Sequence, residues 1–450
     1  MKSLVIQNNK LLNKGIIRHW NVVLLMSLAS IVALFFVDRT SLFSYGYALI
    51  LLTAISYLVS RNEVKDVFFT YHFYLFFAIA FYVIFKYQFP NYLGLSGGAD
   101  FGTDDGRYFA QIVGGRGINY TIEVSTIDLM AYSILLKVLY PFSVYTPLNI
   151  VVINTLFTAF LPIYTRRFAN ILSDNREVGN RAFWLSMLCP FTIYFGCIIM
   201  RDVFTTLLVI AGMCYFLEKK YVHLLFCIVL ITWVRFGTIS FLICGIIILY
   251  RFKLKKKSKD LYFNILLALL LLVFYFAFSF LQDFSGGKLE GGLIRSSDSD
   301  FWSDSTIGSI MKLPFPINIV LSTTFFFFIP LLTFPETRYG HYLISAFFQG
   351  VLTPLYMFFL WKNIFNTILM AFYGKHREKA KQFFYIALIF SILLGTISLQ
   401  SRHKTVLFPI ICIMAAYGSV YYNKKYTGTD TLIATVIIFV QILLALISLR

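Results

Sequence analysis

Long apolar runs, each about the length of one membrane crossing, recur from one end of the chain to the other. A bilayer core is roughly 30 Å thick and takes about 20 apolar residues per helical crossing. Backbone polar groups must be satisfied internally in lipid, so we expect each run to be a helix. The pattern predicts an all-α, polytopic integral membrane protein with about thirteen spans. They are residues 21–37, 41–60, 67–85, 145–164, 182–199, 203–217, 221–234, 236–250, 261–280, 343–361, 383–399, 405–421 and 431–449.

Two intervals between these runs are long, glycine-rich and acidic, and we expect both to be periplasmic loops: residues 86–125 and 282–316. The stretch 126–140 is apolar without being a clean span, which favours an amphipathic helix on the outer membrane surface. If residues 317–334 crossed the whole membrane, the basic run 375–381 would lie on the outer side, unlike the other basic loops. We therefore expect a re-entrant or broken segment there.

Composition agrees with a membrane protein. Hydrophobic residues make up 59% of the chain and charged residues 13%, against about 25% charged in soluble domains. The basic N-terminus before the first run resembles a secretory signal, but no small-residue cleavage site follows, so we expect a retained span. All six cysteines fall inside apolar runs and read as core residues. No internal repeat or soluble domain is visible, so residues 1–450 are expected to form a single transmembrane domain.

The net charge of +18 is distributed unevenly along the chain. If the N-terminus is cytoplasmic, every predicted cytoplasmic loop is basic. These loops contain Arg61 and Lys65, Arg166 and Arg167, Lys219 and Lys220, the runs 253–259 and 375–381, and Lys424 and Lys425. A basic excess confined to one side indicates membrane orientation and contact with anionic lipid headgroups, and it argues against a nucleic-acid partner.

The first periplasmic loop contains a candidate acid–base group. Asp104 and Asp105 stand just before a stretch that reads as a helix from Tyr108 onward. A helix N-terminus stabilises ionised carboxylates, so the two could act as a base or a metal ligand just above the membrane. The alternative is a plain helix cap in a solvated loop.

Charged residues at the membrane boundary are costly and are therefore functional candidates. Arg201 and Asp202 stand at a periplasmic hairpin, where a structural ion pair is the alternative. Arg235 interrupts an apolar stretch and could lie in a water-filled cavity. Further candidates on the same side are Arg338, Arg402, His403 and Lys404, although the last three could belong to an ordinary solvated loop.

Several cations converging on one cavity would suit a pyrophosphate, because charge-assisted donors bind phosphate oxygens strongly and stabilise them in a leaving group. His72, His223 and His341 are isolated and read as structural. No spacing of His, Asp and Glu resembles a metal site, and no cofactor is expected.

The order of these motifs resembles the membrane glycosyltransferases of the C-type superfamily. The resemblance covers about residues 95 to 420. It rests on the Asp104-to-Tyr108 pattern before a surface helix, the turn from Pro190 to Asp202 and the arginine at 235. A Pro-Phe-Pro entry at 314–316 and a C-terminal stretch from Arg402 to Gly418 complete it. Within that group, chain length, span number and two large outer loops are similar to the Wzy-type O-antigen or capsular repeat-unit polymerases.

The resemblance implies polymerisation of sugar repeats carried on undecaprenyl pyrophosphate, at the periplasmic face of a bacterial inner membrane. It implies Asp104 as the base or acceptor-orienting group, with Asp105 in support. Substrate contacts would come from Arg201, Asp202, Arg235, Arg338, Arg402, His403 and Lys404. The implied partners are the lipid-linked glycan donor and acceptor, membrane lipids, a chain-length regulator and a flippase.

Two rival functions stay open at this point. One is a transferase that adds a single sugar from a polyprenyl-phosphate donor. The other is a flippase or transporter of lipid-linked oligosaccharide, although transporters usually show two similar halves and short loops.

Overall fold

A computed structural model describes residues 16–17, 19–88, 94–95, 104–113, 127–253, 317–328, 343–373, 376–397 and 401–421, with isolated positions beyond 431. Every regular element in these ranges is a helix, so the predicted all-α class is confirmed there. Among the described residues, five helices are long and apolar enough to cross a bilayer. The count of thirteen spans stays a prediction, because 261–280 and most of 431–449 lie outside the described residues.

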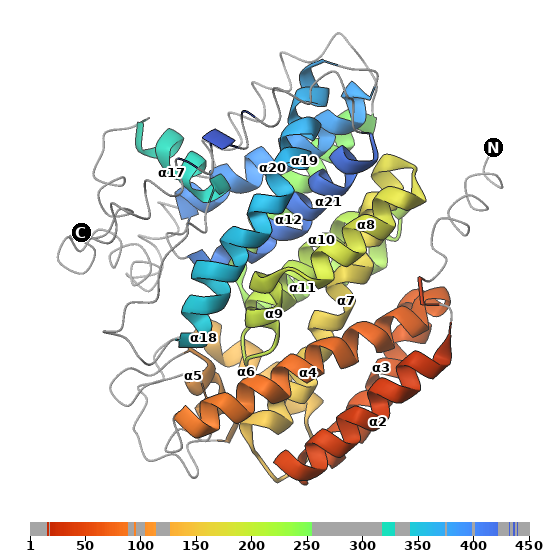
Figure 1. The fold of residues 1–450 in the computed structure, drawn as a ribbon, viewed down its shortest axis with the longest axis vertical. Helices are drawn as coiled ribbons and strands as arrows, with labels where there is room; N and C mark the ends of the chain where they lie inside the picture. The colour runs from red at the N-terminus through yellow and green to blue at the C-terminus, as the bar shows by residue number, and fades with distance from the viewer. Residues whose placement is uncertain are drawn as a thin grey trace.

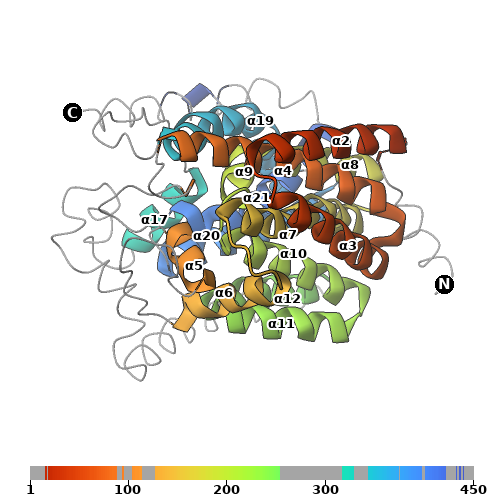
Figure 2. The ribbon, with the colours of Figure 1, turned by 90° about the horizontal axis from the view of Figure 1, so that it is seen from below.

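The N-terminal helices follow the predicted spans closely. They are α2 (Trp20–Val37), α3 (Ser41–Ser60) and α4 (Val64–Gln88). Large apolar side chains cover the exposed surfaces of α2 and α3, as lipid contact requires. In Figures 1 and 2 these two helices form one edge of the bundle.

The helix α7 (Pro147–Ser173) is the centre of the bundle. Its apolar window is 94% buried within the protein, against 17% for α2. The Thr146 hydroxyl caps it by accepting from the Asn149 amide, and Pro147 occupies the first turn, where no amide donor is needed. It packs against α4, α8 (Arg176–Met187) and α10 (Asp202–Glu218). It also extends nine residues beyond the predicted span 145–164.

The predicted span 182–199 is built from two helices. The chain leaves α8 after Met187 and starts α9 (Pro190–Gly196) at a proline, which has no amide to continue a helical ladder. After α10 come α11 (Tyr221–Val234), a 3₁₀ turn η3 (Phe236–Thr238) and α12 (Ile239–Lys253).

The C-terminal part is α17 (Ile317–Phe328), α18 (Leu343–Ala346), a π-helical turn η6 (Phe347–Leu352), α19 (Thr353–Phe372), α20 (Arg377–Ile397), the 3₁₀ segment η7 (Ser401–Val406) and α21 (Phe408–Val420). The helix α17 packs against α20. It makes up the first part, residues 317–328, of the segment 317–334. The re-entrant path stays a prediction, because the rest of that segment lies outside the described residues.

Two short helices come from the region of the first long loop: α5 (Asp104–Val113) and α6 (Ile127–Leu139). They pack on each other, and in Figure 1 they lie near the C-terminal end of α4. The expected helix at 126–140 is confirmed, whereas its position on a membrane surface stays a prediction. The second long loop, 282–316, lies outside the described residues.

Charged residues gather at opposite ends of this bundle. The start of α4, the end of α7 and the end of α10 meet through ion pairs of Arg166 and Arg167, and we name this the Arg166 end. At the other end α10 begins and α11 finishes, joined by an ion pair of Asp202, and we name this the Asp202 end. The helix α10 therefore separates the two groups of charges. Arg166 and Arg167, which the sequence assigns to the cytoplasmic side, lie at its end, and the candidate residue Asp202 lies at its start.

The turn between α2 and α3 is tied to α7 at the Asp202 end. The Asp38 carboxylate accepts from Thr146 Oγ1 at 2.7 Å and from two hydroxyls of its own turn, Thr40 and Ser41. Burial alone would raise the pKa of Asp38, but these hydroxyl donors outweigh it and hold the pKa below its ordinary value.

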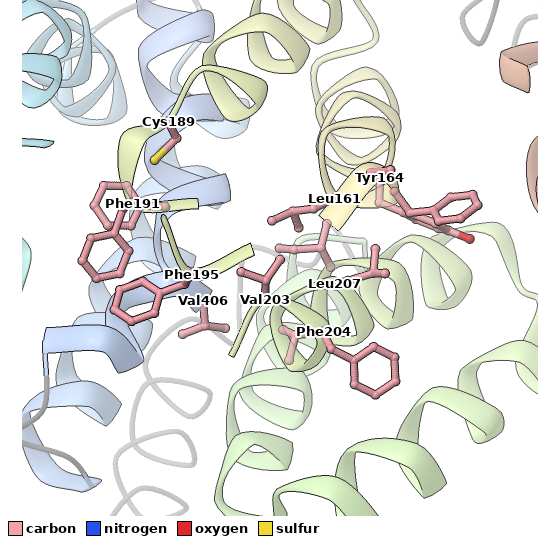
Figure 3. Close-up of a cluster of buried hydrophobic side chains, with 14 of the residues drawn as sticks. Leu161, Tyr164, Cys189, Phe191, Phe195, Val203, Phe204, Leu207 and Val406 are labelled. Carbon is pink, nitrogen blue, oxygen red and sulfur yellow. The ribbon is translucent and has the colours of Figure 1, made fainter. Parts of the chain in front are cut away.

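A continuous apolar core fills the space between α7, α9, α10 and η7. Figure 3 shows part of it, where Val406 of η7 lies close to Val203 of α10 and to Phe195 of α9. All six cysteines are free and buried, in agreement with their expected role as core residues. Close packing here fixes where η7 and the first turn of α10 stand relative to each other.

Candidate functional site at the Asp202 end

The centre of the candidate site is an ion pair between Asp202 and Arg235. Arg235 Nη1 lies 2.5 Å from Asp202 Oδ1, and the two side chains are 17% and 3% exposed. Asp202 opens α10, where the positive end of the helix dipole favours its negative charge. Arg235 has an extended backbone conformation between α11 and η3. This break between the two helices directs its side chain toward α10.

Arg201 adds a second guanidinium beside this pair. Its Nη1 donates to the carbonyl of Val234 at 2.9 Å, at the last residue of α11. Arg201 and Arg235 therefore both bridge the start of α10 and the end of α11. The sequence also allowed an ion pair within Arg201–Asp202, and the structure instead pairs Asp202 with Arg235.

Tyr132 of α6 connects this cluster to the loop helices. Its hydroxyl donates to the carbonyl of Met200 at 3.1 Å and also to Asn154 Oδ1 of α7. Burial raises the pKa of Tyr132 well above its ordinary value, so the phenol stays protonated and remains a donor. Its ring meets the edge of Tyr108 at 5.3 Å between centroids.

The acidic residues of the first loop stand one helical turn before Tyr108. The helix α5 begins at Asp104, earlier than the expected start at Tyr108, so Asp104 and Asp105 both lie in its first turn. Asp104 faces Arg107 at 3.7 Å and its side chain is 21% exposed. Asp105 is buried, and its Oδ1 accepts from the amide of Gly106 at 3.0 Å. The predicted helix N-terminus is confirmed, and Asp104 is the more accessible carboxylate.

The C-terminal candidates lie on η7, which packs against α9 and α10. Lys404 is fully buried, with its Nζ 5.4 Å from the centre of the Phe408 ring, so it is not part of a solvated loop. His403 is partly buried. Of Arg402 only the backbone is described, and Arg338 lies outside the described residues.

A buried cluster of three charged side chains lies at the opposite end. Arg166 donates to Asp66 at 2.6 Å and to Glu63, and all three side chains are at most 2% exposed. Arg167 forms a bidentate pair with Glu218. The prediction that both arginines lie in a basic loop is wrong, because α7 continues past them to Ser173. A second apolar stretch directly after the two arginines was the available signal.

Together, the described candidates fall into one neighbourhood. Asp202 and Arg235 form an ion pair, and Arg201 bonds to the carbonyl next to Arg235. The helix α5, which begins at the two carboxylates, reaches Met200 through Tyr108 and Tyr132, and η7 packs against α10. Such a set offers a carboxylate as a proton acceptor and guanidinium donors for an anion. Within the described residues no three His, Cys, Asp or Glu side chains gather as a metal ion would require.

Comparison with protein-family models, with curated proteins and with solved structures finds no match to this chain. The long apolar helices and their lipid-facing side chains define its class: an α-helical, membrane-embedded protein.

Proposed function

We propose that the protein is a membrane glycosyltransferase that polymerises undecaprenyl-pyrophosphate-linked oligosaccharide repeat units, of the O-antigen or capsule type. The observation that supports this best is the cluster of Asp202, Arg235 and Arg201, joined through Tyr132 and Tyr108 to the helix that begins at Asp104. A proton acceptor and anion-binding donors from distant parts of the chain are what this reaction needs.

In the proposed reaction, a hydroxyl of the acceptor glycan attacks the anomeric carbon of the donor glycan. A new carbon–oxygen bond forms while the bond to the lipid pyrophosphate breaks, and the pyrophosphate leaves with the electron pair. The Asp104 carboxylate, with Asp105 in support, takes the hydroxyl proton. Guanidinium groups neutralise the charge that develops on the departing phosphate.

The role of Asp202 follows from its contact with Arg235. A guanidinium carries five N–H donors in a planar fork, and only Nη1 of Arg235 contacts Asp202 in the pair. Asp202 is therefore a positioning residue that holds the fork in place, and the other donors can meet phosphate oxygens. Arg201, Arg402, His403 and Arg338 complete the proposed contacts to phosphate and glycan, whereas Lys404, also expected there, is fully buried against Phe408.

The proposed site of action is the periplasmic face of a bacterial inner membrane, with the Asp202 end on that face and the Arg166 end in the cytoplasm. Basic residues gather at the cytoplasmic ends of membrane proteins. The proposed partners are the lipid-linked donor and acceptor, with a flippase that supplies the units and a chain-length regulator.

One observation favours the transporter as a second candidate. The crossing made by α8 and α9 is broken at Pro190, and transporters often bind substrate at such discontinuous helices. A single-sugar transferase is the remaining alternative within enzymes.

The test compares Asp104→Asn and Arg235→Lys with Arg181→Lys in the native host. Arg181 is an exposed arginine of α8 and serves as the matched control. Loss of the base costs about 10²–10⁴-fold in rate, and lysine keeps the charge while losing the fork. We expect both site variants to stay in the membrane but to shorten the surface polysaccharide to single repeats, with the control unchanged.

Other results would contradict the proposal. Loss of all surface repeats, with lipid-linked units trapped on the cytoplasmic side, would assign transport instead. Addition of one sugar without repeats in the unmodified host strain would assign the single-sugar transferase. Unchanged chain length in both variants would remove Asp104 and Arg235 from the site.

A further inference from the structure

A second charged hollow lies at the Arg166 end, away from the proposed reaction. It is an open cavity of about 720 Å³ between the starts of α2, α4 and α8 and the end of α3. Three basic and several aromatic side chains line it: Trp20, Tyr57, Arg61, Lys65, Phe68 and Arg176. A hollow lined by basic and aromatic side chains is typical of a site for lipid headgroups at the membrane interface.

Two of the basic side chains lie over aromatic rings of the same hollow. Lys65 Nζ lies 5.5 Å from the centre of the Trp20 ring, and the Arg61 guanidinium lies 6.0 Å from that of Tyr57. Trp20 in turn packs edge-on against Phe68. Aromatic side chains with one apolar and one polar end prefer the level of the lipid headgroups, so this end of α2 and α3 is suited to that level.

The acidic side chains of the same elements are engaged elsewhere. Glu63 and Asp66 turn into the bundle and pair with Arg166. Asp66 also accepts from the backbone amides of Ile16 and Ile17, which holds Ile17 in the wall of the hollow. Glu177, next to Arg176, pairs with Arg181. The charged residues that line the hollow are accordingly all basic: Arg61, Lys65 and Arg176.

The apolar side of the hollow continues onto lipid-facing helix. Tyr57 and Leu58 are 57% and 83% exposed at the end of α3, and Leu24 is 63% exposed one turn into α2. A ligand with a phosphate at the cations could lay an acyl chain along these faces. A soluble phosphate would make no use of them.

We propose that this hollow, here named the Arg61 pocket after its lining residue, binds the phosphate headgroup of an anionic phospholipid from the leaflet at the Arg166 end. Guanidinium and ammonium groups make charge-assisted hydrogen bonds to phosphate oxygens. The site anchors α2, α3 and α4 to one leaflet. It is independent of the proposed glycosyl transfer.

The experiment measures thermal unfolding of the full-length protein in neutral detergent while lipid is added. The additions are phosphatidylglycerol, phosphatidylcholine and soluble glycerol phosphate. The variant is Arg61→Gln/Lys65→Gln, and the matched control is Arg181→Gln/Lys219→Gln, which removes two exposed basic residues from the same end. Each basic residue near an anionic lipid contributes about a factor of five, so we expect about 25-fold weaker apparent affinity for phosphatidylglycerol in the variant.

The expected pattern is stabilisation by phosphatidylglycerol only, lost in the variant and kept in the control. Equal weakening in both double variants would overturn the pocket in favour of diffuse surface charge. Equal stabilisation by glycerol phosphate would overturn the lipid source. If the variant does not fold, brominated phosphatidylglycerol decides the question: it should quench the wild-type fluorescence more than that of Trp20→Phe, and equal quenching would contradict the proposal.

Discussion

Removing the Arg166 side chain should destabilise the bundle more than any exposed charge change at the same end. Arg166 is fully buried, and its two acidic partners are at most 2% exposed. In Arg166→Met both carboxylates would stay in the interior without their cation. Breaking a buried ion pair in this way costs about 3–5 kcal/mol, and about 4 kcal/mol lowers the ratio of folded to unfolded protein about a thousandfold.

Two comparisons isolate this cause. Arg181→Met removes an ion pair whose side chains are 45% and 58% exposed, which costs at most about 0.5 kcal/mol. The triple variant Glu63→Gln/Asp66→Asn/Arg166→Met removes all three charges while the amide oxygens remain as acceptors. It should recover most of the lost stability, because an uncompensated buried charge is the main cost.

The assay is reversible unfolding in mixed micelles with increasing sodium dodecyl sulfate, followed by helical circular dichroism. We expect stability to decrease in the order wild type, Arg181→Met, triple variant, Arg166→Met. A free energy of unfolding for Arg166→Met equal to that of Arg181→Met would refute it, as would a triple variant less stable than the single one.

Three further predictions concern the Asp202 end and the two faces. Tyr132→Phe keeps the ring but loses the hydrogen bonds to Met200 and Asn154, so the free energy of unfolding should fall by at least about 1 kcal/mol in the same micelle assay; no change would contradict the link through Tyr132. The pKa of Asp38 is depressed in the folded protein, so its stabilisation is present above the ordinary pKa of about 3.9 and is lost as pH falls through the folded value. Wild type should therefore exceed Asp38→Asn in stability at pH 6 and approach it near pH 2, and a constant difference would contradict this. Because the native cysteines are buried, Ser143→Cys should react with a membrane-impermeant thiol reagent in spheroplasts, and Lys220→Cys only after lysis; the reverse pattern would invert the orientation.

Much of the helical layout was predictable from apolar run length alone. The spans at 21–37 and 41–60 match α2 and α3 within a residue or so, because a helix that faces lipid must be apolar along its whole length. The rule is weaker for α7, which is enclosed by protein. Its polar residues are satisfied by other helices, so it continues past the apolar run and carries Arg166 inside.

The sequence predicted which residues belong to the candidate site better than it predicted which of them contact each other. Arg201, Asp202 and Arg235 were visible as charges that interrupt apolar sequence, since such residues are costly unless they have partners. Which partner each takes depends on how α10 and α11 pack, and sequence spacing does not encode that. The link from Tyr132 to Met200 joins residues 68 positions apart and carries no local signal.

The most direct test of the central proposal is chain growth by the purified protein in liposomes that contain lipid-linked repeat units from the native host. Wild type should convert single units into a ladder of lengths on a gel and release the lipid pyrophosphate, while Asp104→Asn should form the ladder at least about a hundredfold more slowly. A wild-type sample that forms no ladder, or an Asp104→Asn sample that forms it at the wild-type rate, would contradict the account.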